Sequence, residues 1–185
     1  MLTLGVIADT HIPDRARQVP PLVFTIFKQA KVTEILHAGD ISTQRVLDQL
    51  EEIAPVQAVR GNRDWFVKNL PMHMTLKYED VTIGLTHGHG SFRGYILDKL
   101  HYFLRGPRKF AYVENIALGI FPEADVIVFG HNHVPVNRRM DNGQLLFNPG
   151  SPTIPNFFVK NVPTCVGLIH IDGSMVEGEI VEITN

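Results

Sequence analysis

The sequence predicts an α/β fold in which two β-sheets pack face to face, with helices on the outside. Two observations lead to this prediction. The first 64 residues alternate between short apolar runs and amphipathic segments in the order β-α-β-α-β, which is typical of a parallel sheet covered by helices. After residue 72, most apolar runs are paired across short turns, which is typical of antiparallel hairpins. A parallel half followed by a mainly antiparallel half indicates two packed sheets.

The first half of the chain is expected to contain three strands and two helices. A Pro-Pro pair at residues 20–21 opens the first helix, because Pro is tolerated in the first turn. Residues 22–30 are apolar nearly all round, so this helix should be well buried. Ser42 or Thr43 can cap the second helix, whose apolar residues recur at helical spacing until Pro55 ends it. The expected strands are residues 2–8, 33–37 and 56–59.

The second half is expected to contain hairpins, one further strand and a helical segment. The Asn142-Gly143 pair is a strong hairpin signal. In segment 91–122, apolar residues recur at helical spacing on both sides of Gly106-Pro107, which predicts two helices. The expected strands are the pairs 72–78 with 81–86, 134–140 with 144–147 and 166–171 with 175–183, and the buried run 125–129.

Composition and charge narrow the class of protein. A chain of 185 residues with 44% hydrophobic and 19% charged residues suits one globular domain, 1–185, with a helical insert at about 91–122. The net charge of -2 provides no basic field, so no nucleic-acid partner is expected. No apolar run approaches the ~20 residues of a bilayer span, so no membrane span is expected. The single cysteine, Cys165, excludes a disulfide within the chain and fits a cytoplasmic location.

Side chains of metal-ligand type follow the apolar runs. Asp9 and His11 end the first run, and residues at i and i+2 of an extended chain point to the same side. His131 and His133 repeat this arrangement later in the chain. In parallel sheets, ligands collect at the carboxyl ends of the strands. The strand ends together supply Asp9, His11, Asp40, Asn62, His87, His131 and His133.

This set points to two metal ions. Two carboxylates, one amide and four imidazoles exceed what one tetrahedral ion needs, and they suit two ions that share a bridging carboxylate. A mixed nitrogen and oxygen set favours Mn, Fe, Co, Ni or Zn over Ca or Mg. We therefore expect two divalent metal ions as cofactors, with manganese the first choice among these five.

The motifs resemble those of the calcineurin-like metallophosphoesterase superfamily. The matching series is Asp9-x-His11, Gly39-Asp40, Gly61-Asn62-x-Asp64, His87-Gly88-His89 and Gly130-His131-x-His133. The run Asn148-Pro149-Gly150-Ser151 extends the likeness toward the small bacterial and archaeal phosphodiesterases of that family, and toward the retromer subunit that shares their fold. The resemblance implies a four-layer α/β-β/α sandwich of two mixed sheets flanked by helices.

The resemblance also implies a ligand set and a reaction. Asp40 would bridge the two ions. One ion would be held by Asp9, His11, Asp40 and His133, and the other by Asp40, Asn62, His87 and His131. Two ions ~3.5–4 Å apart hold a bridging hydroxide that attacks phosphorus in line. The implied activity is hydrolysis of a small phosphoester, with a phosphodiester favoured.

Three residues near the predicted ligands bear on catalysis. Many relatives have His where this chain has Arg63; an Arg can grip a phosphate oxygen but cannot act as a general acid. His89 is either a substitute acid or a neighbour of the metal site without a proton-transfer role. Asp64 is either an orienting partner for His131 and His133 or a solvated loop residue. Weak general-acid help favours phosphodiesters with good leaving groups.

Segment 91–122 is the other departure, because it is longer than in the small relatives. Lys99, Arg105, Arg108 and Lys109 make it the most basic part of the chain. It could contact an anionic substrate, a partner or a membrane surface, wall one side of the cleft, or form a homo-oligomer contact. Two ordinary outer helices with solvated charges are the remaining interpretation.

Two alternatives to a phosphodiesterase stay open at this point. A phosphomonoesterase would use the same metal ligands, because pocket shape and cationic contacts separate monoesters from diesters. A binding scaffold like the retromer subunit would be expected to lose metal ligands, and this chain keeps all seven. A nuclease is disfavoured by the net charge, and a protein phosphatase by Arg63 in place of His.

Overall fold

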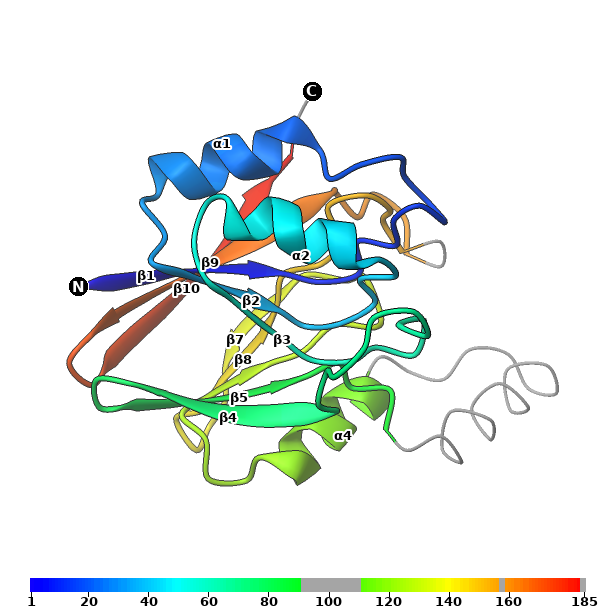
Figure 1. Cartoon of the computed structure of the whole chain (residues 1–185). Helices are drawn as coiled ribbons and strands as arrows, with labels where there is room; N and C mark the ends of the chain where they lie inside the picture. The colour runs from blue at the N-terminus through cyan, green and yellow to red at the C-terminus, as the bar shows by residue number, and fades with distance from the viewer. Residues whose placement is uncertain (91–110, 157–158, 184–185) are drawn as a thin grey trace, which may run out of the picture.

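The computed structural model describes residues 1–90, 111–156 and 159–183, whose strands form two five-stranded sheets (Figure 1). Across the first sheet the order is β10 (Met175–Glu182), β9 (Cys165–Asp172), β1 (Leu2–Ile7), β2 (Glu34–His37) and β3 (Val56–Ala58). β9 is antiparallel to both of its neighbours, whereas β1, β2 and β3 are parallel to one another.

The second sheet is also mixed. Its two edge strands are antiparallel to their neighbours, and its three central strands are parallel. Its order is β4 (His73–Tyr78), β5 (Val81–Thr86), β6 (Val126–Val128), β8 (Leu145–Asn148) and β7 (Val136–Arg139).

The sheets are the inner layers of a four-layer sandwich, which confirms the predicted fold class. In Figure 1, α1 (Pro21–Gln29) and α2 (Gln44–Glu51) cover the outer face of the first sheet, and α4 (Ala111–Ile120) covers that of the second. The apolar core has three parts that match these interfaces. Phe147 lies between the sheets, Phe27 is on the buried face of α1, and Phe121 directly follows α4. Full burial of a side chain of this size stabilises the fold by about 1.5–3 kcal/mol.

The helices begin and end close to their predicted limits. Thr43, and not Ser42, caps α2, because its hydroxyl accepts a hydrogen bond from the amide of Arg45. α2 ends at Glu51, before residue 54, and residues 52–53 form a turn. Of the two helices expected in segment 91–122, the second is α4, and the first lies outside the described residues. Within the described ranges, no helix has the length and apolar character needed to cross a membrane.

The later strands do not form a separate antiparallel sheet. β5, β6 and β8 are parallel, and the last hairpin returns to the first sheet, where β9 pairs with β1. A hairpin turn is visible in the sequence, whereas pairing between distant strands leaves no local signal.

The parallel strands of both sheets end on one side of the molecule. The amide of Asp9, after β1, donates to Gly39 O, after β2, at 2.9 Å. The amide of Gly130, after β6, donates to His87 O, after β5, at 3.3 Å. His87 Nδ1 lies 2.8 Å from Ala38 O, which connects the two sheets. The loops that carry the predicted ligands are thereby held together.

Candidate metal centre

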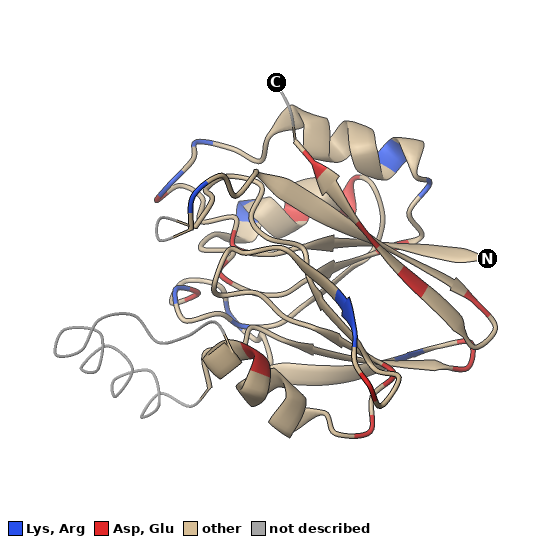
Figure 2. Cartoon of the chain, turned by 180° about the vertical axis from the view of Figure 1, so that it is seen from behind, with Lys and Arg blue, Asp and Glu red and all other residues tan. Residues whose placement is uncertain are grey.

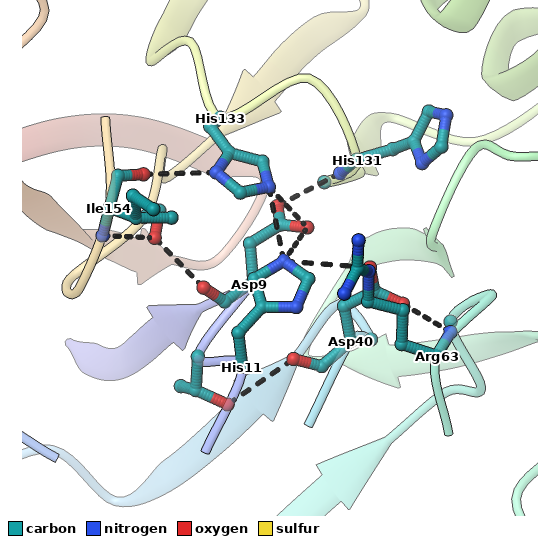
Figure 3. A network of polar contacts seen from close by, with 12 residues as sticks. Asp9, His11, Asp40, Arg63, His131, His133 and Ile154 are labelled. Carbon is teal, nitrogen blue, oxygen red and sulfur yellow. Dashed lines mark hydrogen bonds and ion pairs between the residues drawn. The ribbon is translucent and has the colours of Figure 1, made fainter. Parts of the chain in front are cut away.

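One group of ligand atoms comes from the loops after β1 and β6 (Figure 3). The Nε2 atoms of His11 and His133 lie 3.1 Å apart. Asp9 Oδ1 lies 3.4 Å from Nε2 of His133 and 3.8 Å from Nε2 of His11. These three atoms lie within 4.8 Å of one another, close enough to bind one cation.

A second group comes from the loops after β3, β5 and β6. His87 Nε2 lies 3.2 Å from Nδ1 of His131 and 3.1 Å from Oδ1 of Asn62. Ligand atoms of Asp9, Asp40 and His87 also lie within 4.8 Å of one another. This group therefore brings together a second imidazole pair, an amide oxygen and carboxylates.

Asp40 lies between the two groups. Its Oδ2 is 3.6 Å from Nε2 of His11, and its Oδ1 is 3.5 Å from Nε2 of His87. A carboxylate whose two oxygens face different imidazole groups has the geometry of a bridging ligand. Asp9 also lies within reach of both groups. The structure thus brings all seven sequence-predicted ligands to one place.

Backbone carbonyls fix the tautomer of one histidine in each group. His133 Nδ1 lies 2.9 Å from Ile154 O, and His87 Nδ1 lies 2.8 Å from Ala38 O. A carbonyl oxygen only accepts, so both Nδ1 atoms carry the proton and donate it. The Nε2 lone pair of each ring then faces the centre, as a metal ligand requires.

Burial favours the neutral form of His11, His87 and His133. It lowers the pKa of His11 to about 2, with help from His133 and Arg63, and it lowers the pKa of His87 to about 4. Burial raises the pKa of Asp40 to about 6 and that of Asp9 well above its usual value. These carboxylates are destabilised as anions unless a cation lies beside them.

The donor set fits divalent metal ions. Asp9 Oδ1 is fully buried and has no hydrogen-bond partner among the described residues. A buried acceptor without a partner costs free energy that a bound cation would remove. Neutral imidazole nitrogens with carboxylate and amide oxygens are ligands for Mn, Fe, Co, Ni or Zn.

The backbone at the ligands is held in a rarely populated conformation. Positive φ angles are found at Asp9 (54°), His11 (47°), Asp40 (54°), His131 (74°) and His133 (56°). Each such residue costs about 1–3 kcal/mol and persists only where its surroundings enforce it. Backbone strain at five of the seven predicted ligands indicates that these loops form a functional site.

Asp64 binds backbone amides of two ligand loops. Its Oδ1 accepts from the amides of Ile41 and Ser42, and its Oδ2 accepts from that of Gly61, all at 2.7 Å. It is buried and holds the loop after β2 against the loop after β3. Its burial contradicts the interpretation as a solvated loop residue.

Arg63 and His89 lie at the edge of the centre. The amide of Arg63 donates to Asp40 Oδ1 at 2.8 Å, and its half-exposed guanidinium lies 3.7 Å from Asp14 Oδ2. The His89 ring is centred 5.2 Å from that of His87. Burial first, and then the neighbouring His87 and Arg60, lower the pKa of His89 to about 4.

Sequence reasoning missed the residues that hold the ligand loops in place. His37 is buried; its Nδ1 accepts from the amide of Gly39, and its Nε2 lies 3.2 Å from the hydroxyl of Thr10. Asn148 donates to Gly130 O, and Ser151 donates to Asp9 O at 2.8 Å. The run 148–151 was a signal for these contacts, but the sequence did not reveal which loops it would meet.

Gly61 leaves no room for a side chain. A Cβ there would overlap the amide nitrogen and Oδ1 of Asp40. We expect Gly61→Ala to destabilise the protein by about 1–3 kcal/mol, because the two loops would be forced apart. The measurement is the urea midpoint of metal-free protein.

Gly119→Ala is the matched control for this prediction. Gly119 is exposed in α4, with no atom within 4 Å of an added Cβ, so the change should stabilise the helix by about 0.5–1 kcal/mol. Equal midpoints for the two variants would contradict the close approach of the loops at Gly61.

Comparisons with known proteins identify the family of this chain. The calcineurin-like phosphoesterase superfamily domain matches residues 2–174. A probable metallophosphoesterase of Methanothermobacter thermautotrophicus is 36% identical over 181 residues, covering 97% of this chain and 92% of that protein. The phosphodiesterase YfcE of Escherichia coli is 35% identical over 179 residues, covering 84% and 82%.

The fold has solved neighbours as well. A crystal structure of Vps29 from Entamoeba histolytica, complexed with zinc, aligns with a TM-score of 0.73 at 22% identity, covering 98% of this chain and 99% of that one. At this identity the likeness supports the fold alone. The family match covers residues 2–174, and two relatives are more than 30% identical. The chain therefore belongs to the calcineurin-like phosphoesterase superfamily.

Proposed function

We propose that this protein is a phosphodiesterase that depends on two divalent metal ions, with Asp40 as the bridging ligand. The observation that carries the proposal is the pair of imidazole groups on either side of Asp40, at 3.5 and 3.6 Å from its two oxygens. The name of the Escherichia coli relative, a phosphodiesterase, supports the same substrate class.

The protein's own part is to hold the ligands in place and to keep the rings of His11, His87 and His133 neutral. Bound metal ions would lower the pKa of a water molecule toward neutrality and neutralise charge developing on the phosphoryl oxygens. Manganese is our first choice. Zinc is the natural comparison, because a Vps29 structure of this fold contains it.

Positive side chains around the centre favour an anionic substrate. The positive charges of Arg63 and Arg15 help to lower the pKa of His11, and that of Arg60 helps to lower the pKa of His89. In Figure 2, several blue Lys and Arg segments lie in loops on the side opposite the N-terminus, the side on which β1 ends. A chain with a net charge of -2 thus places arginines where a phosphate would approach.

The groups near the centre give little help to a poor leaving group. Arg63 carries a guanidinium, which does not act as a general acid. His89, with a pKa of about 4, is almost entirely neutral at pH 7 and is a weak candidate for the general acid. We therefore expect aryl and other activated diesters to react best.

The test is hydrolysis of bis(p-nitrophenyl) phosphate and of p-nitrophenyl phosphate by metal-free protein titrated with Mn²⁺, and in parallel with Zn²⁺. We expect turnover that rises with metal, saturates near two equivalents, and is faster for the diester. Faster monoester turnover would make the protein a phosphomonoesterase. Two bound equivalents without turnover of either ester would favour the binding scaffold.

A further inference from the structure

A cleft opens directly beside the candidate metal centre. Its volume is about 550 Å³. Asn62 and Arg63 form the wall nearest the centre, and Trp65, Phe66 and Pro13 form the apolar part. A group attached to a phosphate at the centre could therefore extend into this cleft.

The aromatic wall is unusually exposed. Trp65 is 65% exposed and Phe66 is 86% exposed. Among the described residues, the other exposed large hydrophobic side chains are those of Met1, Met72 and Met175. Two adjacent exposed aromatic rings are costly to leave in water, and here both line a cleft that borders a functional site.

The rings are presented by a well-anchored loop. Asp64, immediately before them, accepts three backbone hydrogen bonds, and Val67, immediately after them, is buried in the core beneath α1 and α2. The amide of Trp65 also donates to Arg63 O at 2.9 Å. Anchors on both sides reduce the entropy lost when a ligand orders this segment.

The cleft also contains polar groups of a kind that binds a phosphoester. The Arg63 guanidinium faces Asp14 at 3.7 Å, with both side chains partly exposed, so a phosphate oxygen could compete for it. Ser42, another lining residue, is 7% exposed, and its hydroxyl has no hydrogen-bond partner among the described residues.

We propose that Trp65 and Phe66 form a subsite for a planar aromatic ester group of the substrate, an aryl or a nucleoside group. Arg63 holds the phosphate of that substrate at the boundary between the cleft and the metal centre. The inference rests on the proposed function, since it names the class of ester that the site prefers. A planar ring can stack on the exposed aromatic wall, whereas a methyl ester leaves that wall in water.

The first experiment measures binding without turnover. Phenylphosphonate and methylphosphonate share the charged group and differ only in the ring, and neither carries an ester that can be hydrolysed. Isothermal titration of zinc-supplied protein should give about tenfold tighter binding of phenylphosphonate. Trp65 is the single tryptophan of the chain, so its emission should change saturably with phenylphosphonate and much less with methylphosphonate.

Variants assign the difference to the aromatic wall. Trp65→Ala should bring the two affinities to within about twofold, and Trp65→Phe should keep most of the preference. Met175→Ala is the matched control, because Met175 is 67% exposed on β10 and does not line the cleft. Equal affinities in the wild type, no binding of either phosphonate, or an unchanged preference in Trp65→Ala would each overturn the subsite.

A kinetic experiment distinguishes an aryl group from a nucleoside group as the occupant of the subsite. It also separates failure of the subsite from failure of the proposed function. Phenyl p-nitrophenyl phosphate and the thymidine 5′-p-nitrophenyl diester share a leaving group. A larger rise in KM for the second ester in Trp65→Ala identifies a nucleoside group, and equal rises identify a general aryl subsite. Selective phosphonate binding without turnover of any ester would keep the subsite and refute the hydrolytic function.

Discussion

Replacing Asp40 by Asn is expected to lower kcat/KM for an aryl phosphodiester at least about 1,000-fold, or about 4 kcal/mol of transition-state stabilisation. Asp40 contacts both imidazole groups, so the change removes one negative charge from both proposed metal sites at once. Metal affinity should fall in the same variant. The measurements are steady-state kinetics and a calorimetric Mn²⁺ titration.

The loss should not come from unfolding. Asn can still accept the hydrogen bond that the amide of Arg63 donates to Asp40 Oδ1. The change also removes a buried carboxyl whose pKa burial raises to about 6, so the metal-free variant should be at least as stable at pH 7.5 as the wild type. Asp48→Asn, on the exposed face of α2, is the control and should leave activity unchanged. Activity within tenfold of the wild type in Asp40→Asn would refute a shared bridging carboxylate.

The part of the site that sequence could predict is the part that follows strand ends. A short apolar run followed by Asp or His identifies both a buried strand and the residue at its carboxyl end. Parallel strands bring such ends together, so Asp9 and Asp40 could be grouped without coordinates. The fold class was predictable for the same reason, since helical and strand periodicities are local.

The part that sequence could not predict depends on pairing and on backbone contacts. The return of β9 to pair with β1 joins residues more than 160 positions apart, and no local pattern records it. Asp64 has the residue type of a histidine partner, but its oxygens are taken by three amides. The acceptors that do orient His87 and His133 are the carbonyls of Ala38 and Ile154, which any residue type could supply.

Removal of divalent metal is expected to have the second large effect, this time on stability. At metal concentrations 100 times the dissociation constant, each occupied site adds about 2.7 kcal/mol to the free energy of unfolding, so two sites add about 5 kcal/mol. The measurement is urea unfolding at pH 7.5 with Mn²⁺ and with a chelator. Ca²⁺ is the control ion, since the imidazole-rich set should bind it poorly. Identical midpoints with Mn²⁺ and chelator would contradict a metal site at this centre.

The stabilisation by metal should weaken as the pH falls, because burial raises the pKa of both Asp40 and Asp9; for Asp40 the window can be stated. The pKa of Asp40 is about 6 in the metal-free folded protein, whereas an unperturbed Asp carboxyl has a pKa of 3.8. The folded protein therefore holds this proton more tightly than the unfolded chain does. This group therefore favours metal-free folding below pH 3.8, and that contribution is lost as the pH rises through 6. Below pH 6 a metal ion must displace the proton of the Asp40 carboxyl. The affinity of the protein for the metal should therefore fall about tenfold per pH unit for each proton released.

The histidines should contribute little to this competition above pH 5, because the pKa of His11 is lowered to about 2 and that of His87 to about 4. Proton release on Mn²⁺ binding, measured by calorimetry in buffers of different ionisation enthalpy, should be larger at pH 5.5 than at pH 7.5, because Asp40 is protonated in the metal-free fold below about pH 6. In Asp40→Asn the release at pH 5.5 should drop. Release that instead centres near pH 6.5 and is unchanged in that variant would identify ordinary, solvated imidazoles as the titrating ligands, and would contradict the buried neutral histidines on which this centre is built.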